Sequence, residues 1–217
     1  MTKITSFLLI IFSLFSTTIL TGCATHGVVT IPIKAPIVNP EFDGKTFTTQ
    51  LFYSQPEPGL FTAGKQLQLK PIEDAQLSVG ASRVLSHFNS LFKIQLPEGS
   101  IFVNKGISDY TLIIELYAKD KFGPSYADYD ALLSLGKSFL TLGLGSAEYT
   151  IIADFNITYK LKDSKGNILY KKDFSVNEKV DHEKDAFDHF AMGDDLASEL
   201  LEKNIVLTMN DFFKSTI

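Results

Sequence analysis

The stretch EYTIIADFNITYKLK, residues 148–162, decides the fold that the sequence predicts. Its apolar and aromatic residues fall at every second position, which is the spacing of a β-strand with one buried face. That face carries Tyr149, Ile151, Ala153, Phe155, Ile157, Tyr159 and Leu161. The opposite face is mostly polar, so we expect it to meet water. A strand of this length with one covered face predicts a sheet whose core lies on one side only.

The segments around this strand extend the same pattern. The polar turn at 163–167 leads into a second strand, Ile168 to Val176, and the two should form a hairpin. Strands are also predicted from Thr46 to Tyr53 and from Tyr110 to Lys119, because apolar residues alternate there. The fold should therefore be built on one antiparallel or mixed sheet.

Two helices are expected beside the sheet. The first follows an apolar stripe at three- and four-residue steps: Leu77, Ala81, Val84, Leu85, Phe88, Leu91 and Phe92. The second is predicted from Asp185 to Lys214, with a kink near Gly193. The order of elements predicts an α+β fold, two-layer, with a mainly antiparallel sheet and helices packed on one face. We expect a single domain from residue 46 to residue 217.

The N-terminus has the layout of a secretory signal. Lys3 precedes an uncharged run, Phe7 to Leu20, whose 14 residues are too few to span a bilayer. Leu20-Thr21-Gly22-Cys23 follows and resembles the lipobox of bacterial outer-membrane lipoproteins. The resemblance implies that residues 1–22 are a cleaved signal peptide and that Cys23 carries the lipid. Ala24 after the cysteine implies the outer membrane, with the domain on its periplasmic face.

Residues 23–45 are predicted to be a tether between the lipidated Cys23 and the domain. Pro32, Pro36 and Pro40 recur at four-residue spacing, which favours a semi-stiff extended spacer tens of ångströms long. The alternative is that Val28 to Ile33 pairs with the domain as an edge strand. Cys23 is the one cysteine in the sequence, so no internal disulfide can form.

An apolar insert, residues 122–147, separates two of the predicted strands. Its centre, 131–145, contains one charge, Lys137, and is apolar on nearly every side of a helix. Such a helix is either buried in the core or contacts a partner, a lipid or the membrane. The candidate contact residues are Leu135, Phe139, Leu142 and Leu144. Gly136-Lys137-Ser138 fits a loose phosphate-loop spacing, but bulky leucines precede it, so we expect no nucleotide.

The net charge and the motifs of the sequence argue against several classes of function. The net charge is −5, and −6 once Lys3 has left with the signal, so we expect no nucleic acid partner. Acidic residues and two histidines, His182 and His189, are predicted at the start of the last helix, where carboxylates stabilise the helix dipole. A metal bound by Asp185 together with either His182 or His189 is the alternative, but we expect no metal and no cofactor. No nucleophile sits beside a base in a recognisable frame, so we expect no enzyme activity.

The element order together with the lipobox resembles small α+β envelope lipoproteins, among them the lipopolysaccharide-assembly lipoprotein and the auxiliary lipoproteins of ABC transporters. The resemblance implies a non-enzymatic accessory or assembly subunit of an envelope complex, with an envelope protein as its partner. The alternative is a periplasmic carrier of lipid or another apolar ligand. A carrier requires an apolar cavity between the insert and the sheet.

Overall fold

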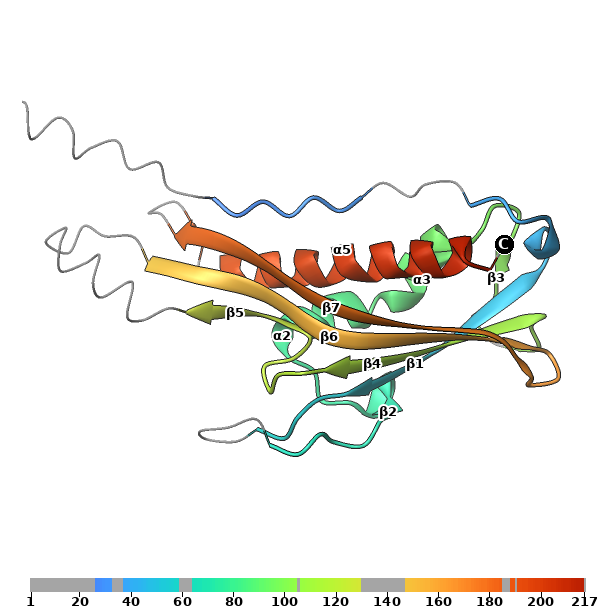
Figure 1. Cartoon of the computed structure of the whole chain (residues 1–217), viewed down its shortest axis with the longest axis horizontal. Coiled ribbons are helices and arrows are strands. Elements are labelled where there is room, and N and C mark those ends of the chain that lie inside the picture. The colour runs from blue at the N-terminus through green and yellow to red at the C-terminus, as the bar shows by residue number, and fades with distance from the viewer. Residues whose placement is uncertain are drawn as a thin grey trace, which may run out of the picture.

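The structure, a computed structural model, describes residues 26–32, 37–58, 64–104, 106–129, 147–184, 188–189 and 191–216. Its centre is β6 (Ala147–Asp163), which contains the stretch that the alternating pattern predicts. All seven residues of the predicted inner face are buried. The hairpin is also confirmed, because β7 (Ile168–Lys184) pairs with β6 in antiparallel register along its length. The α+β fold class is therefore confirmed (Figure 1).

The sheet has seven strands and is mixed, with most of its strand pairs antiparallel. On the side of β6 away from β7, β4 (Tyr110–Ala118) pairs with its second half and β5 (Ser125–Tyr129) with its first half. Beyond β4 lies β1 (Thr46–Ser54), and this pair is parallel. The parallel register follows from the helical segment between them, because strands joined by a crossover run in the same direction.

The outer edge of β1 is covered at its two ends. The start of β1 pairs with β3 (Ile101–Phe102) in parallel, and its end pairs with β2 (Lys70–Pro71) in antiparallel register. Two short turns of 3-10 helix flank these strands, η1 (Pro40–Phe42) and η2 (Ile72–Asp74). The sheet therefore ends in β7 on one side and in this patched edge on the other.

The predicted helix over Leu77–Phe92 is two helices. α2 (Val79–Leu85) begins at the cap of Ser78, whose hydroxyl accepts a hydrogen bond from the N–H of Ala81. α3 (Phe88–Gln95) follows after a break at Ser86 and His87. The apolar stripe runs across the break, because Leu85 and Phe88 are both buried. The spacing of apolar residues predicted the buried face correctly but did not show where the helix ends.

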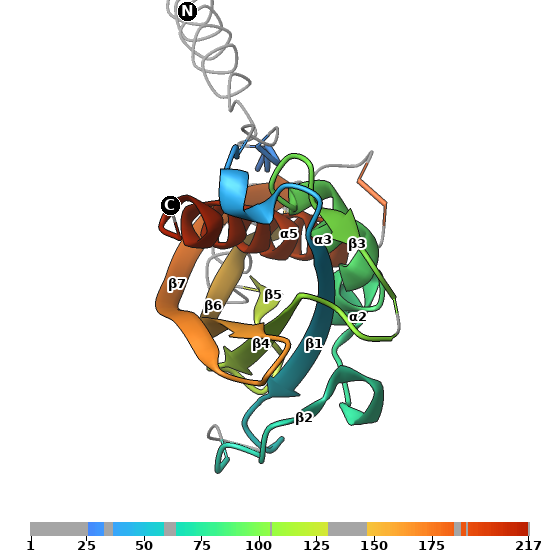
Figure 2. The same cartoon turned by 90° about the vertical axis from the view of Figure 1, so that its right-hand side faces the viewer.

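The last helix, α5 (Met192–Lys214), lies in the curve of the sheet, with α2 and α3 beside it (Figure 2). Its apolar residues are buried on several sides because the sheet bends around them. Tyr159 of β6 is fully buried against this helix, and burial raises the pKa of its hydroxyl, which hydrogen-bonds Thr208 Oγ1 at 2.9 Å. Near its start, a Cβ on Gly193 would lie 2.9 Å from Ala127 Cβ, so glycine permits the close approach to β5.

The prediction that this helix begins at Asp185 is wrong. β7 continues to Lys184, so Asp181, His182 and Glu183 are strand residues and not a helix start. Residues 185–187 and 190 lie outside the described part of the chain. The acidic residues around 181–183 therefore cannot stabilise a helix dipole. The neighbours of His182 are set by its position in β7.

The folded core also begins earlier than residue 46. Ile37 and Phe42 are 1% and 3% exposed and belong to the main apolar cluster, so part of the predicted tether packs as core. The alternative of an edge strand is not observed either, because residues 28–32 form no ladder. Instead, residues 26–32 run from the end of β7 over α5 (Figure 1), where Val29 packs against the core.

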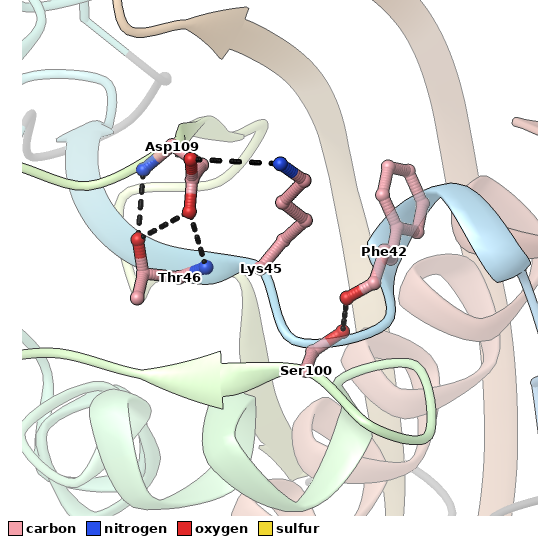
Figure 3. A network of polar contacts seen from close by, with 5 residues as sticks. All are labelled: Phe42, Lys45, Thr46, Ser100 and Asp109. Carbon is pink, nitrogen blue, oxygen red and sulfur yellow. Dashed lines mark hydrogen bonds and ion pairs between the residues drawn. The ribbon is translucent and has the colours of Figure 1, made fainter.

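A polar network fixes the start of β1 to the start of β4 (Figure 3). Asp109 Oδ2 accepts hydrogen bonds from the N–H of Thr46 at 2.9 Å and from its hydroxyl at 2.8 Å. The N–H of Asp109 in turn donates to Thr46 Oγ1 at 2.8 Å. Nearby, the hydroxyl of Ser100 donates to the carbonyl oxygen of Phe42. These bonds set the register at which the parallel pair begins.

Candidate functional site

The site residues predicted from the sequence are not among the described residues. Cys23 and the contact residues Leu135, Phe139, Leu142 and Leu144 lie outside the described ranges, so these assignments remain predictions. No helix within the described ranges has the length and apolar character needed to cross a bilayer. The chemistry that the structure does bring together is a polar cluster at the end of β7, close to the N-terminal segment.

This group, called here the His182 cluster, consists of His26, Gly27, Tyr149, His182 and Asp188. The strand ladder places His182 opposite Tyr149, and their ring centroids are 4.9 Å apart. His26 approaches from the N-terminal segment, with its ring centroid 5.7 Å from that of His182. Burial raises the pKa of the Tyr149 hydroxyl, and the negative charge of Asp188 raises it further.

Both ring nitrogens of His182 have a partner. Nδ1 accepts a hydrogen bond from the N–H of Gly27 at 3.1 Å, so this nitrogen must carry a lone pair. The proton of the neutral ring is then on Nε2, which lies 2.9 Å from Asp188 Oδ2 and donates to it. The side chains of His182 and Asp188 are 3% and 8% exposed, so this pair is closed to solvent.

Glycine at position 27 is required by the closeness of this contact. A Cβ there would lie 2.9 Å from both the carbonyl oxygen of Asp181 and Cγ1 of Val180. Real side chains do not tolerate such distances, so any larger residue would push the segment away from β7. Gly27 and His182 together therefore dock the N-terminal segment onto the end of the sheet.

The cluster includes three residues that could in principle hold a metal ion. Ligand atoms of His26, His182 and Asp188 lie within 4.8 Å of one another. Binding through Nε2 of His182 would need a lone pair there and a proton on Nδ1. The N–H of Gly27 points at Nδ1, so two donors would then face each other. The hydrogen bonds therefore fit a docking contact better than a metal centre.

The metal pairs considered from the sequence, Asp185 with His182 or with His189, lie partly outside the described residues and stay untested. His189 Nε2 lies 3.1 Å from a carboxylate oxygen of Asp195, in the first turn of α5, while His182 is enclosed in the cluster. Asp185 is outside the described residues. Sequence reasoning missed Gly27 as a partner of His182, because the two residues are 155 positions apart.

A second feature is a hollow of about 560 Å³ beside β1, which we call the β1 groove. Residues from β1, from the β2–η2 segment and from α2–α3 line it: Thr49, Gln50, Leu51, Phe52, Pro71, Ile72, Glu73, Leu77, Leu85, Ser86, Phe88 and Asn89. The carrier hypothesis requires a cavity between the insert and the sheet. The β1 groove is formed by other elements, so it does not supply the cavity that this hypothesis requires.

Comparisons with known proteins give no family. No family model and no curated protein sequence matches this chain. Among solved structures, the chain is similar to a protein of Xanthomonas campestris assigned to the family DUF330 (13% identity, TM-score 0.40, covering 89% of this chain and 97% of that one). It is also similar to a structure described as a neuraminyllactose-binding hemagglutinin homologue of Helicobacter pylori (9% identity, TM-score 0.39, covering 87% of this chain and 98% of that one).

A third structure is a protein of Caulobacter crescentus CB15 described as a candidate lipoprotein. It shares 14% identity and has a TM-score of 0.26, with 64% of this chain and 86% of that chain covered. All three likenesses are remote, with identities below 25% and TM-scores below 0.5. The function must therefore be argued from this chain's own residues.

Proposed function

We propose that this protein is a lipid-anchored lipoprotein of the outer membrane, with its domain held close to the periplasmic face. It serves there as a non-enzymatic accessory or assembly subunit of an envelope complex. The signal layout and the sequence Leu20-Thr21-Gly22-Cys23 support the anchor. Ala24 supports the outer membrane as its address.

The observation that carries the proposal is the docking of Gly27 on His182. Gly27 is only four positions after Cys23, and four residues of extended chain span at most about 14 Å. A lipid on Cys23 would then hold the end of β7 next to the membrane. The domain would not be separated from the membrane by a long free spacer. A short link of this kind raises the effective concentration of the domain at the membrane and restricts its orientation.

The strands that lead into and out of residues 130–146, the undescribed part of the apolar insert, meet the same end of the sheet. Tyr129 pairs with Tyr149, and Tyr149 pairs with His182, so these three residues form one rung across the sheet. Ala147, the first described residue after this segment, pairs with Lys184. The insert is thus attached near the docked N-terminal segment, which supports the prediction that Leu135, Phe139, Leu142 and Leu144 contact a partner or a lipid.

The anchor is tested by lipid labelling. Cys23→Ser should abolish incorporation of labelled fatty acid and move the protein from the membrane fraction to the soluble fraction. Thr18→Ala, a substitution within the same signal, is the matched control and should change neither. Unchanged labelling of the Cys23→Ser variant would refute the lipoprotein assignment.

The accessory role is tested by photo-crosslinking in cells from position 139, with Cys23 intact. A discrete protein adduct is expected, and mass spectrometry would identify the complex. Adducts with lipid alone would support the carrier in its place. The absence of any adduct would show that Phe139 is not a contact residue.

A further inference from the structure

The outer edge of β1 has a gap between its two short partner strands. Ladder pairs with β3 end at Phe47, and pairs with β2 begin at Phe52. Within the described part of the chain, residues 48–51 have no strand beside them on this edge. Four residues of strand extend over about 13 Å. The gap is therefore long enough to receive a short extended segment.

The backbone at the gap is oriented for pairing. The carbonyl oxygens of Lys45 and Phe47 accept hydrogen bonds from the N–H groups of Ile101 and Val103, each at 2.8 Å, so they point to this edge. Backbone groups of a strand repeat their direction every second residue, so the N–H and C=O of Thr49 point to the same edge. Any segment that extends the sheet here would pair with Thr49.

The β1 groove lies along this gap and has the walls that such a segment needs. Leu51, Leu85 and Phe88 form an apolar floor on the side of the helices. The rim is polar, with Gln50, Ser86 and Asn89 exposed, and Thr49 Oγ1 donates to Asn89 Oδ1 at 2.7 Å. Glu73 is the one charged residue in the lining. An apolar floor between an open backbone edge and a polar rim is typical of sites that bind extended peptides.

We propose that the β1 groove binds an extended peptide segment of a partner protein, which enters the gap between β3 and β2 as an added strand. Alternate side chains of the segment lie on the apolar floor, and a basic residue lies near Glu73. This inference names the kind of partner that the proposed accessory role requires. Its test does not use the lipid anchor, so either proposal can fail without the other.

The groove fits a peptide better than a purely apolar ligand. An apolar ligand would leave the N–H and C=O of Thr49 without partners while excluding water from them, and this costs free energy. A peptide backbone would satisfy both groups. The charge of Glu73 is likewise matched by a basic side chain and not by a hydrocarbon chain.

The test pans a display library of random linear heptapeptides against the full chain in detergent micelles. A synthetic copy of a selected peptide is then titrated by fluorescence anisotropy, and hydrogen exchange is followed at residues 48–51. We expect slower exchange at Thr49, and a bias towards Lys or Arg in the selected sequences that disappears with Glu73→Gln.

Two pairs of variants distinguish groove binding from general effects. Thr49→Pro removes the N–H at the free edge and keeps the pairing with β4, whereas Thr49→Ala keeps the N–H. Ser86→Trp fills the groove from the helix side, whereas Ser90→Trp places the same residue on α3 outside the lining. We expect Thr49→Pro and Ser86→Trp to weaken binding about tenfold or more, and the two controls about twofold or less. If Thr49→Pro disturbs folding, the comparison of Ser86→Trp with Ser90→Trp still tests whether the peptide binds in the groove.

Three results would overturn the proposal. The first is a failure to recover peptides whose binding responds to Ser86→Trp. The second is displacement of the selected peptide by a fatty acid, which would make the groove a lipid site. The third is self-association of the chain that Ser86→Trp abolishes, which would make a second copy the occupant.

Discussion

Two side-chain contacts hold the N-terminal part of the chain to the sheet, and they differ in burial. In the first, His182 joins the N–H of Gly27 to the carboxylate of Asp188, and both side chains are closed to solvent. In the second, Asp109 binds the N–H and hydroxyl of Thr46, but its side chain is 43% exposed and Lys45 lies 3.9 Å away. Each contact joins residues far apart in the sequence.

The difference shows what burial does to a polar contact. When one partner of a buried hydrogen bond is removed, the remaining polar group has no partner, because water cannot easily reach it. The loss of folding free energy is therefore large. An exposed contact can exchange its partner for water, so its loss costs little, and it responds instead to pH and salt. The following predictions test this contrast, from the largest expected effect to the smallest.

His182→Ala should have the largest effect. It removes the acceptor of the Gly27 N–H and the donor to Asp188, and we expect the free energy of unfolding to fall by about 3 kcal/mol. Chemical denaturation measures this, with the exposed neighbour Lys179→Ala as control. A loss below about 1 kcal/mol would show that water replaces the imidazole at no great cost.

Gly27→Val should act on one side of the same contact. The new side chain cannot fit against Asp181 and Val180, so residues 26–32 should detach while the His182–Asp188 bond remains. We expect a loss of about 1 kcal/mol in stability and much faster hydrogen exchange in this segment. Val28→Ala, at an exposed position, is the control. Unchanged exchange at residues 26–32 would contradict the docking role of Gly27.

Asp109→Asn should have a small effect that depends on pH. Hydrogen bonds from Thr46 hold the pKa of Asp109 below its usual value, with a smaller contribution from Lys45. The carboxylate therefore stabilises the fold above the pKa it has in the unfolded chain, and this contribution is lost as pH falls through its folded pKa. The variant should have a lower thermal midpoint at pH 7, and the difference should shrink towards pH 2.

Thermal melts of both forms from pH 7 to pH 2 measure this, with Asp74→Asn, an exposed carboxyl on η2, as control. A gap between the two forms that stays constant over the range would show that the Asp109 charge does not contribute. The His182 and Asp109 contacts would then differ in how much they stabilise the fold, but not in whether they depend on charge.

The core of the fold could be predicted because its signal is local. Each signal comes from one segment that packs against one layer of the fold. These signals are the alternation in β6, the polar turn after it and the apolar stripe of α2–α3. The parallel pairing of β1 with β4 was not predicted, because the alternation within a strand says nothing about the direction of its neighbour.

The second half of β7 was missed because its inner face contains polar residues. Glu178 and His182 lie on the same face as Val176 and Val180, and each is held by partners from elsewhere. Glu178 accepts hydrogen bonds from Lys203 and Asn204 of α5, as His182 does from Gly27. If Glu178 and His182 are counted as inward-facing positions, the two-residue alternation continues, and the predicted strand becomes longer. The partners themselves could not be found from the sequence, since they depend on how distant segments pack.

The contact between Gly27 and His182 also has a consequence for the order of events during the proposed export. If the chain is exported and lipidated as proposed, the residues next to Cys23 leave the cell interior first, yet the docking site of Gly27 is completed only 155 residues later. Contacts between such distant parts of a chain form late, because a long loop must close first. The segment around Cys23 should therefore stay accessible to the processing enzymes until β7 has formed. A chain that ends at residue 167 should be lipidated as efficiently as the full chain.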